Sequence, residues 1–235
     1  YRHIDTAQAY GNEEGVGRGV RASGIAREEL FVVSKVAAEH KTYAAAAASI
    51  DGSLQKTGLA YLDMMLIHSP QPWAEWRGEK RYFAENREVW RALEDACAAG
   101  KLNALGVSNF LRDDLAALLP HCRIRPAVNQ VLAHIGYMPD DLIAYCTAQG
   151  MATEAYSPSA HGEALKDRVI AETAAACGVT AAQLCIRSVL QRGLVALPKA
   201  SSYAHIRDNA ALDFVIAPED MRRLDALDFH DYGEY

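Results

Sequence analysis

The sequence lacks the patterns that mark disulfide-stabilised and metal-binding proteins. Its 235 residues include five cysteines, an odd number, and none of them has CxxC spacing. The eight histidines form no HxH or HExxH pair, so we expect no bound metal. Scattered thiols without disulfide spacing are typical of the reducing cytoplasm, where we expect this protein to be located.

Charge and hydropathy argue against two further classes of protein. The formal net charge is −6 and no run of lysine and arginine is present, so we expect no nucleic-acid partner. No apolar stretch reaches the ~18–20 residues that a membrane span needs, so we expect no membrane partner. The composition, half hydrophobic and 23% charged, is ordinary for a globular domain.

Short apolar runs alternate with longer helix-forming stretches along the whole chain. The runs expected to form strands are residues 1–5, 30–35, 63–68, 104–108, 126–130, 151–156 and 194–198. The stretches expected to form helices are residues 13–21, 43–57, 86–99, 112–119, 140–149, 167–177, 181–191, 203–211 and 218–227. Apolar strands that alternate with helices predict a parallel sheet covered by helices.

Two architectures fit this alternation, an open doubly wound sheet and a closed (β/α)8 TIM barrel. The GxGxxG fingerprint of the open form is absent after the first strand, which favours the barrel. A barrel of this kind has eight strands, whereas seven are visible. Either one strand has been overlooked or the chain lacks its first βα unit. We predict the second, in a single α/β barrel domain over residues 1–235.

Four polar residues lie at or just beyond the carboxyl ends of the first three strands. Asp5, Lys35 and His68 end successive strands, and Tyr10 follows Asp5 in the next loop. The carboxyl ends of barrel strands meet at one mouth, where active sites form. Taken singly, each residue has a structural interpretation, such as a turn-capping aspartate, a solvated lysine, a loop aromatic or a packed histidine. Their occurrence together favours a catalytic site.

Reduction of a carbonyl group uses this set of side chains. A hydride that reaches the carbonyl carbon leaves negative charge on oxygen, which a nearby acid must protonate. Tyr10 is the candidate acid, and an adjacent Lys35 ammonium would stabilise the phenolate that remains. Asp5 would hold the lysine charged and oriented, and His68 could donate a hydrogen bond to the substrate oxygen.

The same segments resemble the aldo-keto reductase family. The first seventeen residues, YRHIDTAQAYGNEEGVG, resemble the family's first signature, and LFVVSK, LDMMLIH, LGVSNF, PAVNQ, EAYSP and LPKAS follow in the family's order. The stretch AYSPSAHGEALKDRVI is most similar to the bacterial branch that includes 2,5-diketo-D-gluconate reductases. The resemblance implies an oxidoreductase that reduces aldehydes or ketones, including 2-oxoaldehydes and keto-sugar acids. It assigns the roles above to Asp5, Tyr10, Lys35 and His68.

The resemblance also implies a cofactor, NADPH, with some use of NADH. Ser108, Asn109 and Gln130 match residues that hold the nicotinamide carboxamide, and Tyr156 matches the aromatic residue that stacks on the ring. The residues that match the pyrophosphate and adenosine contacts are Ser157, Ser159, Lys199, His205 and Asn209. Without the resemblance, Ser108–Asn109 would be interpreted as the N-cap of the helix expected at 112–119.

Three departures from the family pattern affect these expectations. Ser69 stands where the family has a tryptophan after the histidine, so we expect a wider or more polar substrate pocket, bordered by Ser69 and by Trp73 of the loop 71–82. His205 replaces the arginine that binds the 2′-phosphate, and a neutral imidazole offers one donor where a guanidinium offers a charged fork. We therefore expect a weakened preference for NADPH, most visible above pH ~7, where an ordinary histidine is neutral. His134–Ile135–Gly136–Tyr137 replaces the family's His-Pro-Tyr.

Two other interpretations remain open. Lys35 could form a Schiff base in a barrel aldolase, or the barrel could bind a nicotinamide cofactor as a sensor or subunit without efficient turnover. The family's N-terminal hairpin and first βα unit have no counterpart in the sequence, and a barrel without them would expose strand edges and lose stability. We expect a small-molecule carbonyl substrate as the ligand and a monomer or weak oligomer.

Overall fold

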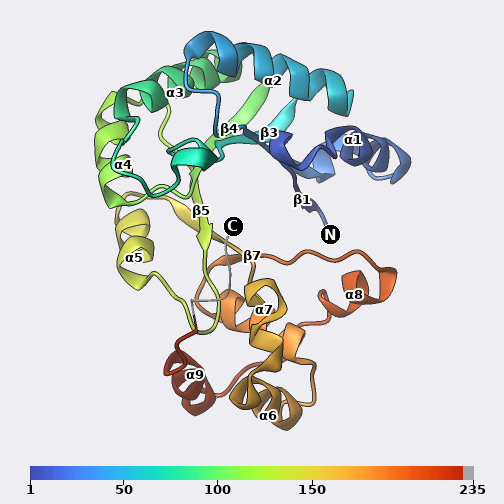
Figure 1. Cartoon of the computed structure of the whole chain (residues 1–235). Helices are drawn as coiled ribbons and strands as arrows, with labels where there is room; N and C mark the ends of the chain where they lie inside the picture. Colours follow the sequence, from blue (N-terminus) through green and yellow to red (C-terminus); the bar gives the residue numbers. More distant parts are fainter. Residues whose placement is uncertain (230–235) are drawn as a thin grey trace. The chain divides into compact units, whose positions relative to one another are not determined.

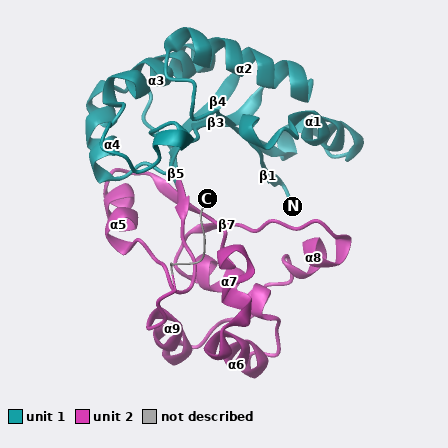
Figure 2. Cartoon of the chain, in the orientation of Figure 1, with its two compact units in different colours: residues 1–129 teal, residues 130–235 magenta. Residues whose placement is uncertain are grey.

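The computed structural model describes residues 1–229. The chain divides into two compact units, residues 1–129 and residues 130–235, shown in different colours in Figure 2. Each unit is described separately below. The predicted single domain over residues 1–235 therefore stays a prediction, and its last six residues lie outside the described part of the chain.

The first unit is a succession of four βα pairs. Its strands are β1 (His3–Asp5), β2 (Phe31–Val36), β3 (Leu62–Ile67) and β4 (Leu102–Ser108), and its α-helices are α1 (Glu13–Ala22), α2 (Tyr43–Thr57), α3 (Phe83–Ala98) and α4 (Arg112–Leu118). Four 3-10 helices lie between them, η1 (Gln8–Tyr10), η2 (Arg27–Glu29), η3 (Trp73–Glu75) and η4 (Leu119–His121). Strand β5 (Val128–Leu132) crosses the boundary between the units.

The strands of the first unit are parallel, and their carboxyl ends lie at the same edge. Asp5 pairs with Val33, two residues before Lys35, and Lys35 pairs with Leu66, two residues before His68. Helices α1, α2 and α3 lie along one side of these strands (Figure 1). The residues between the layers are buried and apolar, because a strand covered by helices excludes water from its side chains; all six residues of β3 are buried. This register brings the predicted site residues to one rim.

Helix α2 shows how the local sequence sets the helix boundaries. The Thr42 hydroxyl accepts a hydrogen bond from the Ala45 N–H at 3.2 Å and so caps the amino end. A run of alanines, 44–48, favours the helical conformation. Gly58 ends the helix with a φ of 64°, and its N–H donates to the Leu54 carbonyl.

Gly17 allows close contact between α1 and α2. A Cβ at this position would overlap the Thr57 carbonyl at the end of α2, whereas a Cβ at Gly19, in the same helix, would meet no atom. Because the obstacle is backbone, we expect Gly17→Ala to destabilise the protein by about 3 kcal/mol, which lowers Tm by about 6–12 °C. Gly19→Ala is the matched control, and it should raise stability by about 0.5–1 kcal/mol. Calorimetry compares the two variants, and equal Tm values would contradict this account of the α1–α2 contact.

Besides the end of β5, the second unit contains two strands and five α-helices in its described residues. The strands β6 (Ala152–Tyr156) and β7 (Val195–Leu197) are parallel, with Tyr156 paired to Leu197. The helices are α5 (Asp140–Ala148), α6 (Arg168–Ala176), α7 (Ala181–Gln191), α8 (Tyr203–Asp208) and α9 (Pro218–Asp225), with the 3-10 helices η5 (Ala160–Gly162) and η6 (Ala164–Lys166). The core of this unit includes Ile170, Leu184 and Leu224, which are fully buried.

The predicted strands and helices all occur, and most boundaries agree within two residues. Helix α3 begins three residues earlier than expected, and α8 ends three residues earlier, with Asn209 as its C-cap. Between residues 1 and 229, no single helix is long and apolar enough to cross a membrane. One pair of helices in this range, α6 and α7, reaches the length and apolar composition of a membrane span when the two are taken together, and they are bent by 86° relative to each other.

Candidate active site

Lys35 is the centre of a polar cluster at the carboxyl ends of β1 and β2. Its side chain is fully buried, and its Nζ donates to Asp5 Oδ1 at 2.5 Å, to the Thr6 carbonyl at 3.0 Å and to the Tyr10 hydroxyl at 3.4 Å. Asp5 ends β1 and Tyr10 ends η1, so one loop brings both groups to the lysine. The ion pair with Asp5 compensates the buried ammonium and directs it toward the phenol.

His68 lies beside this cluster, immediately after β3. It is 7% exposed. Burial, and to a smaller extent the charge of Lys35, lower its pKa to about 3, so the imidazole is neutral at physiological pH. A neutral imidazole carries one N–H donor. Its Nδ1 is buried and has no hydrogen-bond partner in residues 1–229.

Two aromatic rings contact His68 edge-on. The Tyr10 ring lies 5.5 Å from it between centroids, and the Trp73 ring lies 5.1 Å away. Tyr10 is 52% exposed and Trp73 is 37% exposed. The phenol therefore borders both the buried lysine and open space, which is the placement that a proton donor to a bound molecule needs.

The two expected substrate-pocket residues differ in accessibility. Trp73, in η3, borders His68 directly. Ser69 is fully buried, and its hydroxyl accepts from the Gln71 N–H at 3.2 Å. The hydroxyl of Ser69 thus shapes the start of the loop 71–82, and its expected contact with a substrate stays a prediction.

Ser108 and Asn109 lie at the carboxyl end of β4, on the same rim as the polar cluster. Both are buried, and Asn109 Nδ2 donates to the His68 carbonyl at 3.0 Å and to Ser108 Oγ at 3.1 Å. Asn109 has a φ of 64°, a conformation that asparagine tolerates better than most residues. The interpretation of this pair as a helix N-cap is wrong, because α4 is capped at Leu111, whose N–H donates to Asp114.

The other expected cofactor residues belong to the second unit. Gln130 is buried and donates to Glu154 Oε2 at 2.8 Å. Tyr156 ends β6, and after it the chain turns at Ser157, whose φ is 52° and whose Oγ contacts His161 Nε2 at 2.9 Å. The remaining expected residues lie further along this unit: Ser159 is at the N-cap position of η5, Lys199 and His205 are exposed, and Asn209 is at the C-cap position of α8.

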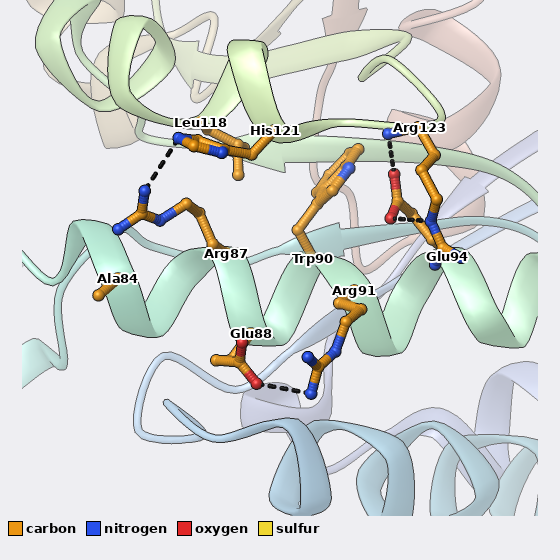
Figure 3. Close-up of a pocket in the computed structure, with 9 residues that line it drawn as sticks. All are labelled: Ala84, Arg87, Glu88, Trp90, Arg91, Glu94, Leu118, His121 and Arg123. Carbon is orange, nitrogen blue, oxygen red and sulfur yellow. Dashed lines mark hydrogen bonds and ion pairs between the residues drawn. The ribbon is translucent and has the colours of Figure 1, made fainter.

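A separate cavity of about 600 Å³ lies on the first unit, between α3 and the segment after α4 (Figure 3). Three arginines line it, each paired with a neighbour: Arg87 with His121, Arg91 with Glu88, and Arg123 with Glu94. Its lining includes the buried Trp90. These pairings hold the arginines to the protein, and none of the predicted site residues lines the cavity.

The sequence analysis missed two residues beside the cluster. Lys41 and Asn86 are buried and bind the backbone that follows His68. Neither residue stands at a predicted strand end. Their burial distinguishes them from surface residues, and burial cannot be read from the sequence.

The chain belongs to the aldo/keto reductase family, whose model matches residues 1–228. It is 42% identical over 228 residues to a glyoxal reductase of Bacillus subtilis, and the aligned region covers 97% of this chain and 79% of the relative. A solved structure of a 2,5-diketo-D-gluconic acid reductase-like protein matches with a TM-score of 0.89 and 30% identity, over 98% of this chain and 79% of that one. A Bombyx mori aldo-keto reductase in complex with NADP matches with a TM-score of 0.84 and 31% identity, over 96% and 78%.

These similarities confirm the predicted family and the predicted barrel fold. The protein is therefore an oxidoreductase of the aldo-keto reductase family, whose members use NAD(P)H.

Proposed function

We propose that this protein reduces the carbonyl group of small aldehydes and ketones to alcohols with NADPH, with Tyr10 as the proton donor. The observation that carries the proposal is the position of the Lys35 ammonium, which bonds both Asp5 and the Tyr10 hydroxyl next to a buried neutral histidine. That arrangement suits a reaction in which negative charge develops on one substrate oxygen.

Each residue of the cluster contributes to that reaction. The Tyr10 hydroxyl gives its proton to the substrate oxygen, and the Lys35 ammonium at 3.4 Å stabilises the phenolate that remains. Asp5 keeps the ammonium in place. The neutral imidazole of His68 donates a hydrogen bond to the same oxygen and orients the carbonyl. The ring of Trp73 borders the imidazole and limits the space in which the substrate lies.

The residues present fit a nicotinamide dinucleotide. In the first unit, the buried amide and hydroxyl of Asn109 and Ser108 supply the polar groups that a carboxamide needs, on the rim that carries His68. In the second unit, the Tyr156 ring ends a strand and is followed by two serines, while the basic side chains of Lys199 and His205 are exposed. When bound, the cofactor supplies the hydride.

Small 2-oxoaldehydes and keto-sugar acids are the proposed substrates. The first class is favoured by the similarity to a glyoxal reductase, and the second by the similarity to a 2,5-diketo-D-gluconic acid reductase-like protein. The proposal is tested by following nicotinamide absorbance while the purified protein is offered a panel of such carbonyls. NADPH oxidation that depends on the carbonyl supports it. Tight NADPH binding without turnover on any member would support the sensor interpretation instead.

The aldolase interpretation is disfavoured by the surroundings of Lys35. A Schiff-base lysine needs a neutral, accessible amine, whereas Lys35 is fully buried and ion-paired with Asp5. Borohydride treatment in the presence of a carbonyl substrate should therefore leave Lys35 unmodified, and mass spectrometry detects any adduct.

We expect the preference for NADPH over NADH to be weak, because His205 stands where the family has an arginine. His205 lies in the first turn of α8 and is exposed, and an imidazole offers a 2′-phosphate fewer hydrogen-bond donors than a guanidinium. His205→Arg should raise the NADPH/NADH ratio of kcat/KM by at least ~10-fold, because a guanidinium offers the 2′-phosphate a charged, forked donor. Ala204→Arg, on the same exposed helix, controls for added charge. An NADPH/NADH ratio of kcat/KM in the parent as large as that of His205→Arg would contradict the assignment of His205 to the 2′-phosphate.

A further inference from the structure

Three successive backbone carbonyls after β3 are each held by a side chain from a different part of the first unit. The His68 carbonyl accepts from Asn109 Nδ2 at 3.0 Å, the Ser69 carbonyl from Lys41 Nζ at 2.8 Å, and the Pro70 carbonyl from Asn86 Nδ2 at 2.8 Å. Lys41 Nζ also donates to Asn86 Oδ1 at 2.9 Å. The backbone that carries His68 is thus fixed at consecutive peptide units.

Lys41 is an unusual residue for this task. It is 9% exposed, and Asn86 is 2% exposed. Burying an ammonium opposes folding unless strong partners compensate it, and the partners in this network are an amide oxygen and a peptide carbonyl rather than an ion-paired carboxylate. A fold that needed only filled space at this point would use an apolar residue. The unfavourable free energy of burying the Lys41 ammonium is consistent with a requirement for the exact backbone position after His68.

We propose that Lys41, together with Asn86, is a positioning pair for the His68 imidazole during carbonyl reduction. The inference rests on the proposed function. The pair touches neither the imidazole nor a reacting atom. It acts through the carbonyls of residues 69 and 70, whose position sets the direction in which the adjacent His68 side chain leaves the backbone.

The charge of Lys41 responds to pH within a range that an assay can reach. Three carboxylates face the ammonium: Glu39 on its own loop, Glu85 on α3, and Asp114 on α4, which also pairs with Arg81. Burial outweighs their attraction and lowers the pKa of Lys41 to about 8. Below that pH the hydrogen bonds to the Ser69 carbonyl and to Asn86 are charge-assisted, and above it they weaken, since bonds from an ionised donor are about twice as strong.

The test compares steady-state kinetics of the parent and of Lys41→Met across pH. We expect kcat of Lys41→Met to fall by about 10- to 100-fold, because a small displacement of a reacting group has an effect of this size. KM for the carbonyl should change less than about threefold, because no substrate contact is removed. The parent should lose kcat as pH rises through about 8, and Lys41→Met should lack this step. Lys101→Met, at a half-exposed lysine that pairs with Asp51 on the surface, is the matched control and should retain parent kinetic values.

Asn86→Asp keeps an oxygen facing Lys41, adds negative charge and removes the Nδ2 donor to the Pro70 carbonyl, so its kcat should fall at every pH while the alkaline step in kcat remains measurable. The added charge favours the ammonium, so the alkaline step in kcat should move upward by about one pH unit or more. This variant decides the question where Lys41→Met does not fold, since an unmoved step would overturn the proposal. A Lys41→Met protein that folds and keeps the parent's kcat and pH profile would overturn it as well.

A second readout separates this inference from the proposed function. The ring resonances of His68, assigned with a His68→Gln variant, should shift near pH 8 in the parent and not in Lys41→Met. A parent that reduces no carbonyl but shows this shift would refute the proposed function and leave the positioning role supported. An active parent whose His68 resonances and kinetics do not change in Lys41→Met would support the proposed function and refute the positioning role.

Discussion

Replacing Tyr10 by phenylalanine should lower kcat for carbonyl reduction by about 10²- to 10⁴-fold, which is the range for loss of a general acid. The substitution removes only the hydroxyl that accepts from Lys35 and keeps the ring that contacts His68. Because Tyr10 is 52% exposed, the free energy of unfolding should change by less than about 1 kcal/mol. Affinity for NADPH, measured by fluorescence quenching, should remain.

The control for this experiment is Tyr203→Phe. Tyr203 is 82% exposed on α8 and lies outside the polar cluster, so this variant should keep the parent's kcat. Tyr10→Phe activity within about threefold of the parent, with cofactor bound, would show that another group supplies the proton.

Replacing Lys35 by methionine should abolish activity and also destabilise the fold. The variant leaves the Asp5 carboxylate, whose side chain is only 16% exposed, without its cation. Loss of one member of a buried ion pair costs about 3–5 kcal/mol, which corresponds to a fall in Tm of about 6–20 °C for a chain of this length. Activity should fall at least as far as in Tyr10→Phe, because the phenolate loses the ammonium that stabilises it.

A double variant separates the two effects of Lys35. Asp5→Asn combined with Lys35→Met removes both charges, so a large part of the lost stability should return, while activity should stay absent. Thermal unfolding and initial rates measure the two properties on the same samples. Recovery of both together would indicate that Lys35 acts on structure alone, and a stability loss below about 1 kcal/mol in the single variant would contradict the buried pair.

The fold could be predicted from the sequence because its strands and helices are locally encoded. Helix α2 has a capping threonine, an alanine run and a terminal glycine, and β3 is apolar from end to end apart from Asp63. The exceptions are the ends of α3 and α8, where the chain enters or leaves a loop. Hydrogen bonds at helix ends involve residues outside the helix, so hydrophobic periodicity locates such ends poorly.

The sequence by itself determined which polar residues stand at the strand ends. In a parallel sheet, Asp5, Lys35 and His68 must lie on one rim, because residues at the carboxyl ends of neighbouring strands share an edge. What only the tertiary structure decided are distances and burial. The 3.4 Å contact of Lys35 with Tyr10 and the hydrogen bonds from Lys41 and Asn86 join residues 16 to 45 positions apart. Burial likewise comes from the packing around His68, and it keeps this imidazole neutral. Such contacts arise from packing, and the local pattern of residues carries no record of them.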